Sequence, residues 1–75
     1  MPADAVQAVT WYRLAAEAGH SGAQYALGLF YHIGRGVPKD VVESRKWLRR
    51  AADAGDADAS EMLSESMGAA HVGWS

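Results

Sequence analysis

Apolar residues recur at helical spacing along most of the chain. In the first stretch, Ala8, Trp11 and Ala15 lie three or four positions apart, so a helix would carry them on one face. The interior of the second stretch is apolar on nearly every side, which indicates neighbours on more than one face. The pattern predicts four helices, at residues 4–18, 21–33, 40–54 and 57–67. The chain is therefore expected to be all-α.

Residues that favour helix ends agree with these bounds. Asp4, Ser21 and Asp40 are suitable N-cap residues, and each is followed three positions later by Gln or Glu, which completes a capping box. A glycine follows each of the first three helices: Gly19, Gly34 and Gly55. The loop at 34–40 is short, so the helices on either side of it are expected to be antiparallel neighbours. Residues 68–75 follow no part of the pattern and are expected to form a tail.

The chain also repeats itself at an offset of 36 residues, the distance from Trp11 to Trp47. The segments before these tryptophans align as well, Pro2-x-Asp4-x-Val6 with Pro38-x-Asp40-x-Val42. A period of this length is typical of a helical-hairpin repeat, which buries its apolar face only by stacking on copies of itself. We therefore expect Trp11 and Trp47 to fill equivalent spaces between hairpins, with a large apolar burial at each.

The first repeat carries the residues of a known family. They read Trp11-Tyr12-Arg13-x-Ala15-Ala16-Glu17-x-Gly19-His20-x-x-Ala23-Gln24-Tyr25-x-Leu27-Gly28-x-x-Tyr31-x-x-Gly34-x-Gly36-Val37-x-x-Asp40. This run resembles the Sel-one-like repeat family, a close relative of the tetratricopeptide repeats (TPR). The resemblance implies a TPR-like, right-handed α/α superhelix of antiparallel hairpins, with about two repeats in one domain at residues 1–67. It also implies a non-catalytic scaffold that binds a peptide or a partner protein.

The resemblance marks the positions that shape each repeat. They are Trp11, Gly19, Leu27, Gly28, Tyr31, Gly34, Gly36, Trp47 and Gly55. Gly28 lies inside a helix, where glycine costs about 1 kcal/mol relative to alanine, and its small size would let two helices approach closely. In the second repeat, Ser64 and Met67 stand where the first has Gly28 and Tyr31, so the pattern decays toward the end of the chain.

The TPR layout also implies which residues form the concave face. On the second helix this face would carry Tyr25, Leu29, His32 and Ile33, and on the fourth it would carry Asp58, Glu61 and Glu65. The apolar set suits a peptide or a helix from a partner. Two other readings stay open: the first set packs against a neighbouring hairpin, and the second is a solvated acidic face.

The remaining polar residues predict surface roles. The histidines, His20, His32 and His71, lack the spacing of a metal site, so neither a metal nor another cofactor is expected. The pairs Arg13–Glu17 and Arg49–Asp53 are four residues apart, which suits surface ion pairs on a helix.

Composition narrows the classes of function. The chain has no cysteine and no Ser/His/Asp cluster, so no catalytic residue is expected. The formal net charge of -2 argues against nucleic acid, because phosphate binding needs a basic stripe. Three alternatives to the scaffold stay open: a fragment of a larger repeat protein without independent function, a hydrolase of the kind associated with some cysteine-rich members of the family, and an RNA-binding helical repeat.

Two expectations concern the surroundings of the chain. The first helix has no preceding helix to cover it, so we expect it to dimerise or to bind another protein through Ala5, Val6 and Val9. No apolar run approaches the roughly 20 residues that span a bilayer, so no membrane partner is expected. The sequence as given predicts a cytoplasmic protein, and a periplasmic or secreted one if it is a fragment with a signal upstream.

Overall fold

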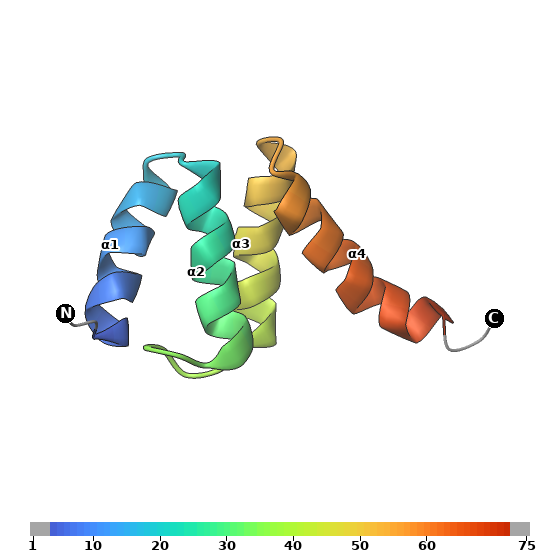
Figure 1. Ribbon diagram of the computed structural model, residues 1–75, viewed down its shortest axis with the longest axis horizontal. Coiled ribbons are helices and arrows are strands. Elements are labelled where there is room, and N and C mark those ends of the chain that lie inside the picture. The colour runs from blue at the N-terminus through green and yellow to red at the C-terminus, as the bar shows by residue number, and fades with distance from the viewer. Residues whose placement is uncertain (1–3, 73–75) are drawn as a thin grey trace.

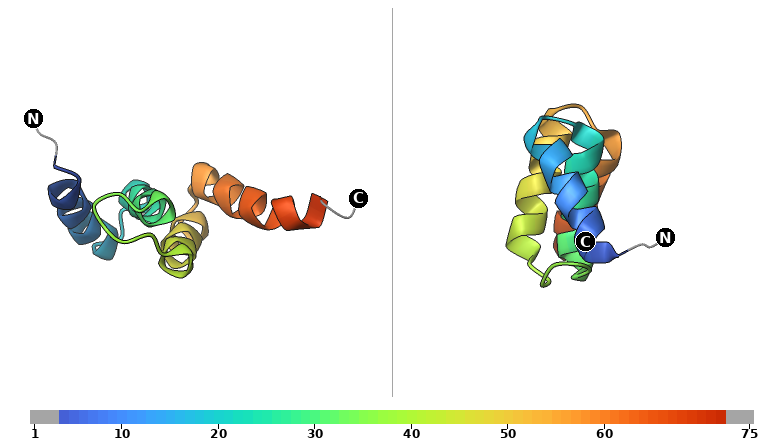
Figure 2. Two further views of the ribbon diagram at one scale, coloured as in Figure 1. Left: turned by 90° about the horizontal axis from the view of Figure 1, so that it is seen from below. Right: turned by 90° about the vertical axis from the view of Figure 1, so that its left-hand side faces the viewer.

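A computed structural model of the protein describes residues 4–72, with side chains described for residues 4–64. The described part contains four helices, α1 (Ala5–Glu17), α2 (Ser21–Ile33), α3 (Val41–Asp53) and α4 (Ala57–Val72), and no strand. Helices α1, α2 and α3 lie side by side, while α4 leans away from α3 along its length (Figure 1). Seen from below, the helices follow one another along the long axis of the molecule (Figure 2). The fold is the expected all-α, TPR-like helical repeat.

Two aspartates cap helices as the sequence predicts. The Asp4 carboxylate accepts a hydrogen bond from the Val6 backbone N–H at 3.0 Å. The Asp40 carboxylate accepts one from the Glu43 N–H at 3.1 Å. Each bond satisfies a donor that the first turn of a helix leaves without a partner, so both residues fix where their helix begins.

The predicted cap at Ser21 is wrong. The N-cap of α2 is His20, which makes no side-chain hydrogen bond to the helix, and Ser21 is the first residue of the helix itself. The side chain of Gln24 does not close a capping box either. Its Nε2 donates to the Ala16 carbonyl at 3.0 Å, so this buried amide ties α2 to the end of α1.

The loop between α2 and α3 returns the chain and passes over α1. Gly34 and Gly36 both have φ of 75°, in the left-handed region that favours glycine. At Gly36 the approach is also close. A Cβ at this position would lie 2.6 Å from the carbonyl oxygen of Ala5 and 2.9 Å from Cγ2 of Val9. The loop is therefore in direct contact with the first half of α1.

A first core cluster joins α1, α2 and α3. Its buried members are Val9, Ala16, Ala23, Leu27 and Trp47, with Ala15, Phe30, Tyr31 and Val37 packed against it. Trp47 reaches this cluster from α3 and is only 7% exposed, and the Arg50 guanidinium lies over its ring at 4.9 Å. Trp47 of the second hairpin thus packs against the first hairpin, as a stacked repeat requires.

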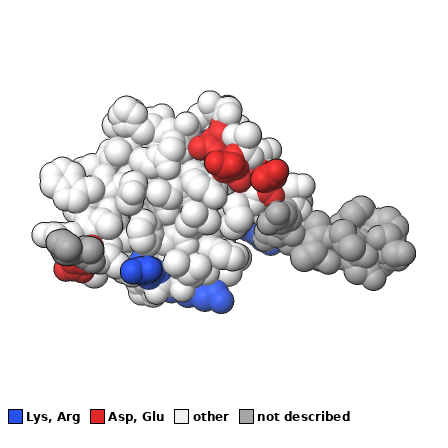
Figure 3. Space-filling view, viewed as in Figure 1, with Lys and Arg blue, Asp and Glu red and all other residues white. Residues whose placement is uncertain are grey.

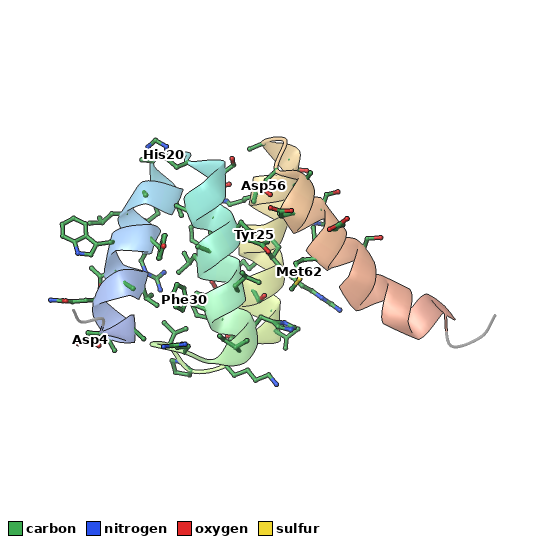
Figure 4. The ribbon with its side chains drawn as sticks, in the orientation of Figure 1. Asp4, His20, Tyr25, Phe30, Asp56 and Met62 are labelled. Atoms are coloured by element: carbon green, nitrogen blue, oxygen red, sulfur yellow. The ribbon has the colours of Figure 1, made fainter. Side chains whose placement is uncertain are left out.

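A second cluster joins α3 to α4 and to one side of α2. Its buried members are Leu48, Ala51 and Ala59, with Tyr25, Ala52, Met62 and Leu63 packed against it. Tyr25 of α2 and Met62 of α4, both labelled in Figure 4, pack against this cluster from different helices. Trp47 belongs to the first cluster, whereas Leu48 and Ala51 belong to the second, so α3 is covered on two sides.

The expected equivalence of the two tryptophans is wrong. Trp11 is 70% exposed, whereas Trp47 is 7% exposed. The reason lies in their neighbours. Trp47 packs on α1 and α2, which precede it in the chain, but among the described residues no helix occupies the corresponding place beside Trp11. A tryptophan at this position of the repeat is therefore buried only when helices that precede it in the chain pack against it.

Two further expectations need correction. Val9 is 4% exposed and belongs to the first core cluster, so it is not available for a contact with another molecule. The large apolar residues that α1 exposes include Val6, Trp11 and Leu14.

Helix α4 runs to Val72 and does not end at residue 67, because Gly68 is followed by two alanines and no proline, and a single glycine does not stop a helix.

Candidate functional site

An apolar groove lies between α1 and α2. It is lined by Tyr12 of α1, by Ala26, Leu29, Phe30 and Ile33 of α2, and by Arg35 of the following loop, and it has a volume of about 260 Å³. Ile33 is 60% exposed, while Leu29 is half-buried. The groove exists because α2 is apolar nearly all round, so burying its inner face against α1 and α3 leaves an apolar outer face.

Two aromatic rings, those of Tyr12 and Phe30, form one wall of this apolar groove. The ring centroids of Tyr12 and Phe30 are 5.6 Å apart, with an angle of 39° between the ring planes. This tilted arrangement is one that aromatic pairs favour. Phe30 lies in the space between α1 and α2 (Figure 4). Because Phe30 also packs on the first core cluster, the wall is anchored to the core.

The residues predicted for the concave face of α2 do not all lie at one site. Leu29 and Ile33 line the apolar groove together. Tyr25 turns toward the other side of the helix and packs on the second core cluster. His32 is half-buried and does not line the apolar groove. Tyr12, Phe30 and Arg35 complete the groove, and sequence reasoning missed them because they come from the buried edge of α2, from α1 and from a loop.

The acidic residues predicted for the same face are separate from the apolar groove. Asp58 and Glu61 are exposed on α4. Glu65 lies further along this helix, and its side chain is outside the described residues. In the space-filling view, acidic atoms gather over the start of α4, whereas the middle of α1 and α2 carries little charge (Figure 3). The acidic and apolar sets therefore do not form one site.

A second groove lies between α3 and α4, and sequence reasoning did not find it. Among the described side chains its lining includes Val42, Arg45, Lys46, Arg49 and Leu63, and its volume is about 390 Å³. We call it the basic groove. The expected pair between Arg49 and Asp53 is not formed, and neither is that between Arg13 and Glu17. Among the described side chains the one ion pair joins Lys46 and Glu43, at 3.3 Å.

Arg13 has a different partner from the one expected. Its guanidinium donates a hydrogen bond to the Tyr31 hydroxyl and lies 5.7 Å from the centre of the Tyr31 ring. A partly buried aromatic hydroxyl offers both a hydrogen bond and a ring face, which an exposed carboxylate on the same helix does not. The contact ties α1 to the end of α2, near the apolar groove.

Among residues 4–64, whose side chains are described, no group of three or more His, Cys, Asp or Glu could hold a metal ion. None of the helices described is both long enough and apolar enough to cross a membrane.

Comparison with known proteins places the chain in a family. The sequence profile of the Sel1 repeat matches residues 1–20 and 21–56. The structure is similar to the crystal structure of a Sel1 repeat protein from Oxalobacter formigenes, with a TM-score of 0.84 and 38% sequence identity over 87% of this chain and 19% of that one. The chain thus spans about a fifth of that protein's length. A search of the curated proteins gave no match. Sel1 repeats generally serve as protein-interaction modules and non-catalytic scaffolds. The chain belongs to the Sel1 repeat family.

Proposed function

We propose that this chain is a non-catalytic protein-interaction module that binds an apolar segment of a partner protein in the apolar groove. One observation carries the proposal. Ile33 is exposed beside the half-buried Leu29, and the rings of Tyr12 and Phe30 form a wall next to them. Exposed apolar residues gathered in one concave place are typical of a contact surface, whereas single exposed ones are common everywhere.

The dimensions of the apolar groove favour a peptide over a small molecule. Its volume of about 260 Å³ is below the range of about 300–1,000 Å³ that holds a drug-sized ligand. A helix or extended segment needs less, because it inserts only a few apolar side chains and leaves its backbone at the rim. Arg35 lies at that rim and has donors for a carbonyl or carboxylate of the segment.

Selection from a displayed library of random peptides tests the proposal. We expect the wild-type chain to enrich peptides with spaced apolar residues, and we expect Ile33→Asp to abolish their binding. Val6→Asp is the matched control, because Val6 is exposed to a similar extent, 59% against 60%, and does not line the groove.

Two outcomes would contradict the proposal. The first is that no peptide is enriched. This would favour the view that Leu29 and Ile33 only pack against another hairpin, or that the chain has no function alone. The second is that Ile33→Asp and Val6→Asp bind the enriched peptides equally well, which would place the contact elsewhere.

A further inference from the structure

The helix pairs α1–α2 and α3–α4 differ in the residues that fill the space between their two helices, which we call the seam. In the pair α1–α2, Val9 is buried under the loop that carries Gly36, and Arg13 donates to the hydroxyl of Tyr31. The apolar side chain of Val9, the guanidinium of Arg13 with its acceptor Tyr31, and the loop between α2 and α3 all contribute. Together they fill the space between α1 and α2 around Val9 and Arg13, while the apolar groove stays open beside Tyr12 and Phe30.

The pair α3–α4 has different residues at the corresponding positions, 36 residues later. Arg45 stands in place of Val9, whereas Arg49 keeps the arginine of position 13. Tyr31 is replaced by Met67, which has no hydroxyl to accept a hydrogen bond. In addition, α4 continues to Val72 where α2 ends and turns back, so no loop covers the seam within the described residues.

The basic groove is the result of these differences. Helix α4 leans away from α3 (Figure 1), and the described residues that line the space are three with cationic side chains and two with apolar ones. Lys46 is paired with Glu43, and among the side chains described neither Arg45 nor Arg49 has an acid within ion-pair distance. Val42 is 69% exposed at one edge, and the half-buried Leu63 lies on the α4 side.

We propose that the basic groove binds an acidic segment of a partner protein, whose carboxylates pair with Arg45 and Arg49 and whose apolar side chain contacts Val42 and Leu63. A planar guanidinium matches a carboxylate with two parallel hydrogen bonds, and such bonds are stronger than neutral ones. Two arginines four residues apart on a helix face the same side and can hold neighbouring acids. This site is separate from the apolar groove and does not depend on the function proposed for it.

The surroundings of the basic groove favour a short peptide over a nucleic acid. The end of α3, the turn that follows it and the first part of α4 carry Asp53, Asp56, Asp58 and Glu61. The chain as a whole has a formal net charge of -2. An extended phosphate backbone would be repelled by these acids beyond the groove, whereas a short acidic segment need not reach them.

Fluorescence anisotropy with a labelled peptide tests this proposal. The probe is a fluorescein-labelled peptide of alternating glutamate and leucine, and the matched probe has glutamine for every glutamate. We expect the glutamate peptide to bind with an affinity that falls as salt is raised. The double variant Arg45→Gln and Arg49→Gln should weaken it by about tenfold, the sum of two exposed but well-oriented pairs.

The matched control is the double variant Lys39→Gln and Arg50→Gln. It removes the same charge from residues that line neither the basic groove nor the apolar groove, so its affinity should stay within about twofold of wild type. A weakening in this control equal to that in the groove variant would overturn the proposal, and so would equal binding of the glutamine peptide. Circular dichroism of both variants verifies that the helices are retained.

Two further outcomes distinguish other occupants. Single-stranded DNA of equal charge that binds more tightly than the glutamate peptide would assign the groove to nucleic acid. Dimers that dissociate on substitution of Arg45 and Arg49 would assign it to a second copy of the chain. Either would overturn the proposal as stated. The Ile33→Asp variant should bind the glutamate peptide as wild type does, so a failure here is separate from a failure of the apolar groove.

Discussion

Gly28 lets α2 approach α3 closely, and alanine at this position should destabilise the fold. A Cβ built on Gly28 would lie 2.8 Å from Cγ and 2.9 Å from Cδ2 of Leu48, and 3.2 Å from the carbonyl oxygen of Ser44. Both neighbours are buried, at 3% and 1% exposed. The Leu48 side chain cannot move aside freely, because it is a member of the second core cluster.

The magnitude follows from two opposing effects. Forcing an extra carbon into a packed core costs about 1–3 kcal/mol. Replacing glycine by alanine within a helix gains up to about 1 kcal/mol, from helix propensity and from the lower entropy of the unfolded chain. Gly28→Ala should therefore destabilise by up to about 2 kcal/mol, and the bulkier Gly28→Leu by more.

Gly22→Ala separates these two effects. Gly22 lies in the same helix, and a Cβ there would have no neighbour within 4 Å. This variant receives only the favourable effect, so it should be as stable as wild type or more stable. The difference between the two alanine variants then measures the packing cost at Gly28 alone.

Thermal unfolding followed by circular dichroism measures this difference. For a domain of this size, 1 kcal/mol shifts the midpoint by about 4–8 °C, so the Gly22→Ala variant should melt at least about 5 °C above the Gly28→Ala variant. Equal midpoints for the two variants would refute the close contact between α2 and α3.

Three other predictions concern single side chains. Trp47→Ala should cost about 3–5 kcal/mol, enough to unfold a small domain, whereas Trp11→Ala should cost less than about 0.5 kcal/mol; far-UV circular dichroism at increasing urea distinguishes them. Tyr31→Phe removes the acceptor of Arg13 and should cost about 1 kcal/mol, measured as a lower urea midpoint with an unchanged slope. The exposed face of α1 should support self-association, so sedimentation equilibrium should show more monomer for Trp11→Glu and no change for Asp58→Lys. A wild-type chain that stays monomeric at high micromolar concentration would contradict this last prediction.

The helical architecture could be predicted because its signals are local. Helical spacing, the aspartate caps and the glycines that follow three helices all act within a few residues, and four helices in the expected order result. The cap of α2 was missed for a reason of the same kind. Ser21 has the right side chain for a cap, but the turn after Gly19 brings the chain into the helix one residue earlier.

The surfaces could be predicted only in part, because they depend on neighbours that are distant in the sequence. Identical spacing made Trp11 and Trp47 look equivalent, yet their exposure differs tenfold, 70% against 7%. The apolar groove needed Tyr12 from another helix. The basic groove could not be predicted because it depends on the direction of the Arg49 side chain. Arg49 lines the groove and forms no ion pair with Asp53, whereas the spacing of the two residues along the helix is compatible with both arrangements.

Binding of a peptide at Ile33 is the most direct test of the proposed function. Ile33 is the single isoleucine of the chain, so labelling the isoleucine δ1 methyl group with ¹³C gives one NMR signal from within the apolar groove. We predict that a peptide selected from the displayed library shifts this signal, and that a titration of the shift gives the same dissociation constant as fluorescence anisotropy. An Ile33 signal that stays in place while anisotropy shows the peptide bound would contradict the account.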